Sequence, residues 1–163
     1  GLCDELRGYH VRLSQKNLGR TQSREKNGQM SIVDDFRQMS DEIGGDIEHR
    51  ARVLAEDGTH FSGAGYEELG TYLDFTLDIH RDTVAAMQER DVAKARLVRK
   101  RKDEGEDHEH SLRDSHLERL DAGLAESIET STAHMDMLTG YRQMGRHHFR
   151  ICRLLEDFLN VPD

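Results

Sequence analysis

Residues 32–54 read IVDDFRQMSDEIGGDIEHRARVL, and this stretch decides the fold. Apolar side chains recur at every third or fourth position, with charged residues at most others; the apolar ones are Ile32, Phe36, Met39, Ile43, Ile47, Ala51 and Leu54. This spacing places one apolar stripe on an α-helix. Gly44 and Gly45 lie mid-stretch, and each costs a helix about 1 kcal/mol relative to alanine. We therefore expect a close packing partner or a kink at the two glycines.

The composition favours an all-α protein. The chain has 163 residues, a length typical of one domain, and it is 35% hydrophobic and 34% charged. A mean hydropathy of -0.81 still permits folding when the apolar residues are confined to stripes. There is a single proline, Pro162, and little β-type alternation. We predict one domain over residues 1–163, an elongated up-and-down bundle of about five helices.

Apolar periodicity predicts four helices besides the one that contains residues 32–54. They cover residues 1–18, 66–90, 92–120 and 124–159, and the segment 59–65 between the second and third helices is predicted to be a turn. The first helix should bury Leu2, Leu6, Tyr9 and Leu13. The inner stripe of the third helix is expected to be Tyr66, Leu69, Leu73, Leu77, His80, Val84 and Met87.

The fourth predicted helix has a polar middle. No apolar side chain occurs between Val98 and Leu112, which predicts a solvated helical face or a frayed segment.

Two short stretches of the chain resemble each other: Phe36-Arg-Gln-Met39 and Tyr141-Arg-Gln-Met144. Both lie on strongly helical segments, so we predict an internal duplication that gives the bundle two related halves.

The charge and cysteine content exclude several classes of partner. A net charge of -9 disfavours nucleic acid and anionic lipid as partners. No apolar run approaches the ~20 residues that span a bilayer. Cys3 and Cys152 are predicted to be free thiols in a reducing cytoplasm. A chain that begins with glycine is expected to be a piece of a longer protein or to carry a tag remnant.

The ten histidines raise the possibility of a metal site, but their spacing matches no familiar motif. There is no HExxH and no pair of Glu-x-x-His motifs. Around His108-Glu109-His110, the residues one turn apart, Glu106 with His110 or His110 with Asp114, are interpreted as surface pairs without a metal. Glu42 and Asp46, also one turn apart, form a candidate half-site for a hard cation. No nucleophile–base pattern or phosphate loop is present. We predict no enzyme, no catalytic residue and no cofactor.

Two blocks of sequence resemble a known family. Residues 33–41, VDDFRQMSD, resemble the V-N-D-L-E-R-I-G-D core of PhoU-like domains. Residues 126–138, ESIETSTAHMDML, are similar to the E-S-I-E-T-S-x-x-H-L-D-L-L of the PhoU-like domain at the C-terminal end of bacterial sodium/phosphate cotransporters. Segments 13–15, 116–120 and 141–147 also match that subfamily, so the resemblance covers nearly the whole chain.

The resemblance implies a fold, a location and a role. The fold would be a cytoplasmic bundle of two PhoU-type halves. The location would be the cytoplasmic side of the inner membrane, where the partner is a transporter's membrane domain. The role would be regulatory or structural. A homodimer is a further expectation, because exposed stripe ends would favour one.

Some PhoU proteins bind metal clusters through a repeated E-x-x-x-D motif, from which this sequence departs. Arg37 stands at the first glutamate, only Asp41 of that copy is kept, and Arg142 and Arg146 occupy both acidic positions of the second copy. Guanidinium groups repel cations, so we predict no PhoU-type cluster. The remaining weak metal candidates are Asp41, His80, His134 and His147.

Three functions remain open at this point. The first is the cytoplasmic regulatory domain of a sodium-dependent phosphate symporter. The second is a free-standing PhoU-like adaptor that regulates phosphate uptake. The third is a metal-binding helical bundle that uses Asp41, His80 and His134 or His147.

Overall fold

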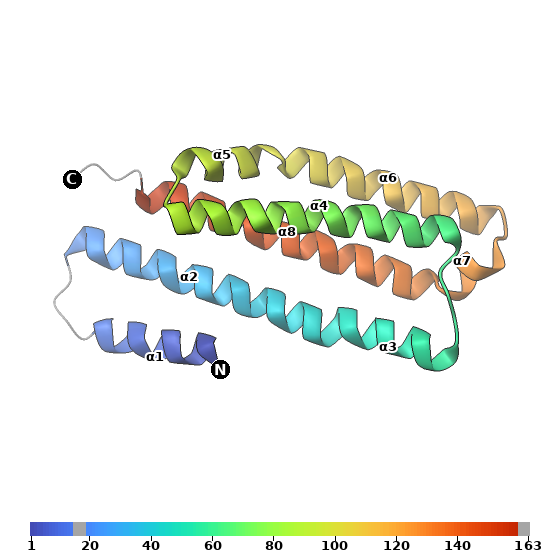
Figure 1. Cartoon of the computed structure of the whole chain (residues 1–163), viewed down its shortest axis with the longest axis horizontal. Helices are drawn as coiled ribbons and strands as arrows, with labels where there is room; N and C mark the ends of the chain where they lie inside the picture. Colours follow the sequence, from blue (N-terminus) through green and yellow to red (C-terminus); the bar gives the residue numbers. More distant parts are fainter. Residues whose placement is uncertain (15–18, 160–163) are drawn as a thin grey trace.

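The computed structural model describes residues 1–14 and 19–159, and over these ranges the protein is all-α (Figure 1). Its elements are α1 (Leu2–Ser14), α2 (Arg20–Glu42), the π-helical turn η1 (Ile43–Ile47), α3 (Glu48–Asp57), α4 (Gly63–Glu89), α5 (Val92–Lys100), α6 (Lys102–Asp121), α7 (Ala125–Glu129) and α8 (Ser131–Leu159). The predicted all-α bundle is confirmed. Residues 15–18, the end of the first predicted helix, lie outside the described residues.

Residues 32–54 cover the later part of α2, the turn η1 and most of α3. These three elements together form one long helical arm. A Cβ added at Gly44 or Gly45 would meet nothing within 4 Å, so no packing partner explains the two glycines. Instead the backbone widens into the π-helical turn η1 at this point, the kink-type alternative of the prediction. The arm ends at Gly58, whose φ of 67° is the left-handed conformation expected at a helix C-terminus.

α4 begins earlier than predicted. Gly63 is already helical, because the Ser62 hydroxyl accepts a hydrogen bond from the Gly65 N–H at 3.2 Å and caps the helix. The expected turn over residues 59–65 is therefore shorter than predicted. At the other end, Arg90 adopts a φ of 51°, and the Asp91 side chain caps α5 by accepting hydrogen bonds from the N–H groups of Ala93 and Lys94, two and three residues on.

The last two predicted helices are each interrupted once. Arg101 separates α5 from α6, and Thr130 separates α7 from α8. The polar middle of residues 92–120 is an ordered helix with one buried face, which contains Gly105 and Glu109. A Cβ at Gly105 would lie 2.9 Å from the Phe75 ring, so the glycine permits close contact between α6 and α4.

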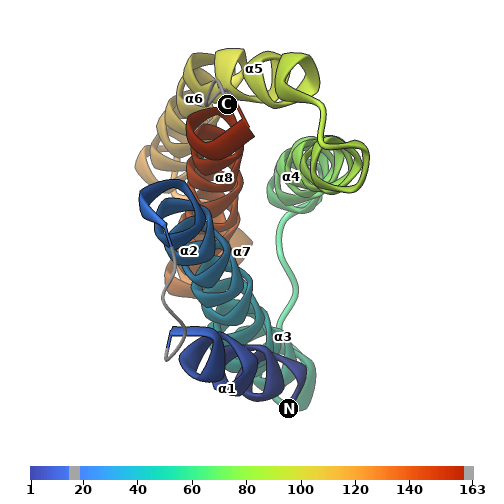
Figure 2. The same ribbon diagram turned by 90° about the vertical axis from the view of Figure 1, so that its left-hand side faces the viewer.

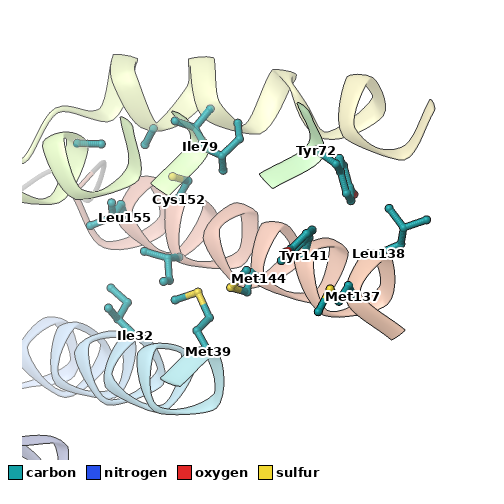
Figure 3. Packing of buried hydrophobic residues seen from close by; sticks show 14 of the residues in the cluster. Ile32, Met39, Tyr72, Ile79, Met137, Leu138, Tyr141, Met144, Cys152 and Leu155 are labelled. Atoms are coloured by element: carbon teal, nitrogen blue, oxygen red, sulfur yellow. The ribbon is translucent and has the colours of Figure 1, made fainter. Parts of the chain in front are cut away.

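α8 is the centre of the molecule. Figures 1 and 2 show α2, α4 and the α5–α6 pair around it, and α8 contacts each of them. Figure 3 shows the resulting core, in which Ile32 and Met39 of α2 lie on the side of Leu155 and Met144 of α8, and Tyr72 of α4 lies against Tyr141 of α8. The bundle is thus organised around α8, and residues 32–54 form one of its walls.

The buried face of α4 was predicted wrongly, because most of its buried residues lie one position earlier in the sequence than predicted. Its buried positions are Gly65, Leu69, Tyr72, Thr76, Ile79, Thr83 and Ala86, whereas Tyr66 and His80 are exposed. Two buried threonines shift the stripe, because the hydroxyls of Thr76 and Thr83 donate to the carbonyl groups four residues earlier and need no other partner.

The predicted inner face of α1 is also wrong in part. Leu2 and Tyr9 are 72% and 55% exposed, and Leu6 is 38% exposed. α1 contacts α2 and leaves much of its apolar stripe in solvent.

Cys3 and Cys152 are both free thiols, as predicted. Burial raises the pKa of Cys152 to about 11.

Candidate functional site

The outer face of α8 carries a row of arginines. Arg142, Arg146 and Arg150 are spaced four residues apart, so they lie above one another along the helix. Together with Gln38 of α2 and with Thr139, Gln143 and His147 of α8 they line a groove of about 450 Å³. We call it the arginine groove. Its floor is α8, which Figure 2 shows between α2 and α6 on the side away from α4.

The two similar tetrapeptides build both faces of this region. The aromatic and methionine side chains, Phe36 and Met39 on α2 and Tyr141 and Met144 on α8, line one apolar groove of about 660 Å³. Gln38 and Gln143, the third residues of the two motifs, both line the arginine groove instead. Each copy therefore turns its apolar residues to one side of the α2–α8 pair and a glutamine to the other.

Asp35 holds one edge of the arginine groove. Its carboxylate is 0% exposed, and it accepts a hydrogen bond from Arg150 Nε at 2.9 Å and lies 2.7 Å from His147 Nδ1. A buried carboxylate is stable only when it is paired, so Asp35 of α2 holds the His147 and Arg150 side chains of α8 in place. The same contact joins α2 to α8.

Glu109 holds the opposite edge. This side chain of α6 is 1% exposed and accepts a hydrogen bond from Arg113 Nε, while Arg142 Nη1 lies 3.7 Å away. Arg113 also donates to the Thr139 hydroxyl at 3.0 Å. The outer face of α8 is thus tied to α2 through Asp35 and to α6 through Glu109.

The groove concentrates positive charge in an acidic protein. Three guanidinium groups, those of Arg113, Arg142 and Arg150, pair with two buried carboxylates, and that of Arg146 also lines the groove. Arg146 has no ion-pair or hydrogen-bond partner among the residues that the structure describes. Such a surface can donate hydrogen bonds to an anion and repels a cation.

The four metal candidates lie in separate places. Asp41 is exposed and pairs with Arg37 at 3.5 Å, and His147 contacts Asp35. His80, predicted to be in the core, is exposed with its ring 5.0 Å from that of His148. His134 is buried elsewhere. Over residues 1–14 and 19–159, no three His, Cys, Asp or Glu side chains are grouped so that they could hold a metal ion.

The candidate half-site at Glu42 and Asp46 includes a basic neighbour. Both residues line a small cavity of about 160 Å³ with Arg50 and Asp136, whose side chains pair at 2.7 Å. Burial, and then the charge of Asp46, raises the pKa of Glu42. The Arg50 charge counts against cation binding in this cavity.

A second polar cluster lies where α4, α6, α7 and α8 meet. Arg119 forms a two-bond ion pair with Glu68, and the rings of His116 and His134 stack with centroids 4.5 Å apart. His116 Nε2 lies 2.9 Å from the Ser131 hydroxyl. We call these five residues the histidine cluster. The Ser127 hydroxyl, which donates to that of Ser62 at 3.2 Å, adds a further link between α7 and the start of α4.

Burial determines the ionisation of this cluster. It lowers the pKa of His134 to about 4, with a further contribution from His116, and it also lowers the pKa of His116. Both rings are therefore neutral at pH 7, and Glu68 and Arg119 are the charged pair. Four of the cluster's residues, His116, Arg119, Ser131 and His134, belong to the segments that resemble the cotransporter subfamily.

The burial of the two carboxylates beside the arginine groove, Asp35 and Glu109, was not predicted from the sequence. Asp35 lies between Ile32 and Met39 at helical spacing, and Glu109 lies between Gly105 and Leu112 in the same way. An acidic residue on the buried stripe of a helix was the available signal. Glu68, in contrast, lies beside the buried stripe, and only the tertiary contact with Arg119 identifies it.

These observations define an all-α domain with a basic groove and a buried polar cluster. The family model described as PhoU domain matches residues 69–155, more than half of the chain. The chain belongs to the PhoU family, whose domains are regulatory and act in phosphate transport. The matched range extends from α4 into α8 and contains the three arginines. Searches of curated proteins and of solved structures gave no match.

The PhoU assignment indicates a role in the regulation of phosphate transport. The helices were also compared with the requirements for crossing a membrane. Across residues 1–14 and 19–159, none of the helices combines the length and the apolar character needed to cross a lipid bilayer.

Proposed function

We propose that this chain is the cytoplasmic regulatory domain of a sodium-dependent inorganic phosphate symporter in a bacterial inner membrane. The PhoU family assignment supports a role in phosphate transport. The attachment to a symporter is the finer part of the proposal, and it rests on the residues shared with the cotransporter subfamily.

The single observation that carries this finer part is the place of the subfamily-like block 126–138. Four of its residues, Ser127, Thr130, Ser131 and His134, are buried or half-buried where α7 and α8 meet the start of α4. Through the histidine cluster this block contacts Glu68 and the segment 116–120, which also resembles the subfamily. Segments 116–120 and 126–138 thus form one contiguous structural unit, which supports a common architecture with those domains.

Regulation by such a domain requires unequal contact with two states of the transporter. A domain that binds both states equally well cannot shift the equilibrium between them. We therefore expect the bundle to contact the inward-open and outward-open membrane domain differently, and the partner is the membrane domain of the same or a neighbouring chain. No catalytic step is part of this role.

The size and membrane partition of the native protein test the proposal. An antibody raised against residues 1–163 would be applied to carbonate-washed membranes and to the soluble fraction of the source cells. We expect a band far larger than the 18.7 kDa of this chain, retained in the membrane pellet. A band near 18.7 kDa in the soluble fraction would contradict the symporter and would favour a free-standing PhoU-like adaptor.

A further inference from the structure

We infer that the arginine groove on α8 is a binding site for a phosphate-type oxyanion, either free phosphate or a linear polyphosphate. This inference goes beyond the proposed function and does not depend on attachment to a transporter. It rests on the position, pairing and charge of the side chains that line the groove.

The first observation is that the arginine at the middle of the row has no protein partner among the described residues. Arg146 lines the groove and has no partner among the described residues, while its neighbours Arg142 and Arg150 both contact carboxylates. A guanidinium group has five N–H donors in a planar fork that matches two oxygens of a phosphate. Arg146 is therefore free to bind a ligand without breaking an existing contact.

The second observation is that the flanking arginines are held in place. Arg150 uses Nε and Nη2 to contact Asp35, at 2.9 Å each, which leaves the Nη1 group for a ligand. Arg142 is positioned more loosely by Glu109 at 3.7 Å. Because both carboxylates are buried, the anchors themselves are fixed, and less side-chain entropy is lost when an anion binds.

The third observation concerns the shape of the ligand. Residues four apart on a helix are separated by about 6 Å along the axis, so the row from Arg142 to Arg150 covers about 12 Å. Neutral donors flank this row, among them the amides of Gln38 and Gln143. One phosphate ion would contact Arg146 and one neighbour, whereas a chain of linked phosphates would contact all three arginines.

Acidic groups limit the site on one side. Glu42 lies beside Gly140, with its Oε1 3.2 Å from where a Cβ at that glycine would be. It lines the adjoining small cavity, which shares Thr139 and Gln143 with the arginine groove. Its negative charge opposes anion binding, so Glu42→Gln is expected to strengthen the binding of the same anion.

Calorimetric titration of the whole chain tests the site, with inorganic phosphate and tripolyphosphate in separate experiments at low ionic strength. We expect saturable binding of at least one of them, accompanied by a rise in Tm. Arg146→Gln should weaken that binding about tenfold or more, the loss expected for one charge-assisted hydrogen bond. Because Arg146 is exposed, the variant should keep the circular dichroism spectrum of the native chain.

Arg24→Gln is the matched control, since Arg24 is an exposed arginine of α2 outside the groove. It removes the same charge and should leave affinity within about twofold. Tighter binding of tripolyphosphate than of phosphate would identify the whole row as the site, and equal binding would identify Arg146 with one neighbour. Absence of both heat and a Tm shift with either anion, or equal losses in the two variants, would overturn the inference and leave the proposed function untouched.

Discussion

Asp35 and Glu109 are the residues on which the outer face of α8 depends. Each is a buried carboxylate that is balanced by arginine, and each joins α8 to a different helix, Asp35 through Arg150 and Glu109 through Arg142. Removing one partner of a buried pair leaves the other without compensation, so the cost of such a change exceeds the small value of a surface pair. These two positions were recognisable in the sequence as acidic residues at core spacing, although their partners were not.

Replacing Asp35 with alanine should destabilise the protein by about 2–3 kcal/mol, because the ion pair with Arg150 and the contact with His147, which join α2 to α8, are lost. The cost stays at the lower end for a buried pair, since the Arg150 side chain is 44% exposed and can be hydrated. Unfolding in urea would measure the difference. Asp34→Ala is the control: Asp34 contacts Arg7 at 3.7 Å on the surface, and its loss should cost less than about 1 kcal/mol. Equal effects of the two variants would contradict this interpretation of Asp35.

Stability should fall as the pH falls from about 6.5 towards 4. Burial lowers the pKa of both His134 and His148 to about 4, whereas an exposed histidine of the unfolded chain titrates near 6.5. Between these values the unfolded chain binds more protons than the folded one, so the free energy of unfolding rises with pH through this interval and is fully present above it.

Urea unfolding at pH 7.5 and pH 5.0 measures this effect. We expect the native chain to be less stable at pH 5.0, and His148→Gln to lose less stability than the native chain between the two pH values. His60→Gln replaces an exposed histidine and should keep the native difference. The same free energy of unfolding for the native chain at both pH values would rule out the titration of the buried rings.

At the scale of elements, the similar tetrapeptides on α2 and α8 show how a sequence repeat becomes structure. Both copies direct an aromatic ring and a methionine into one apolar groove and a glutamine into the arginine groove. The similarity between residues 36–39 and 141–144 could be recognised in the sequence, because the two motifs share helical spacing and composition. Their meeting across the α2–α8 contact could not, since it depends on tertiary packing.

Two glycines should respond in opposite ways to alanine. Gly44→Ala is expected to stabilise the protein by about 0.5–1 kcal/mol, because a methyl group there meets open space and alanine favours helix. Gly105→Ala should cost about 1 kcal/mol or more, because its Cβ would lie 2.9 Å from Phe75, a ring held by Tyr72 and by Arg101. Thermal unfolding of the two variants would show the difference, and a loss of stability in Gly44→Ala would contradict the assignment of η1 as an unpartnered turn.

The positions of the long helical segments followed from apolar spacing, and Gly58 was predictable as a cap. The register of α4 was not, because buried threonines satisfy their own hydroxyl groups and so occupy core positions that a search for apolar residues overlooks. The breaks at Arg101 and Thr130 also gave no local signal, since neither position holds glycine or proline.

For the molecule as a whole, the helix with contacts on most sides is α8. Its buried positions recur from His134 to Leu155, and α2, α4, α5 and α6 all contact it. Residues 32–54 have a regular apolar stripe, and their helices form one wall of the bundle. The stripe of α8 is the more strongly one-sided of the two, because its outer face keeps exposed polar residues such as Arg146, so regular spacing alone did not distinguish a wall from the axis.

The central claim is that this PhoU-family domain regulates phosphate uptake. The most direct measurement is sodium-dependent uptake of labelled phosphate by the source cells, with and without an in-frame deletion of residues 1–163, over a range of external phosphate concentrations. We predict that the deletion changes how the uptake rate responds to phosphate while the dependence on sodium remains. Identical uptake at every concentration, with the remaining transporter present in equal amount, would contradict the claim.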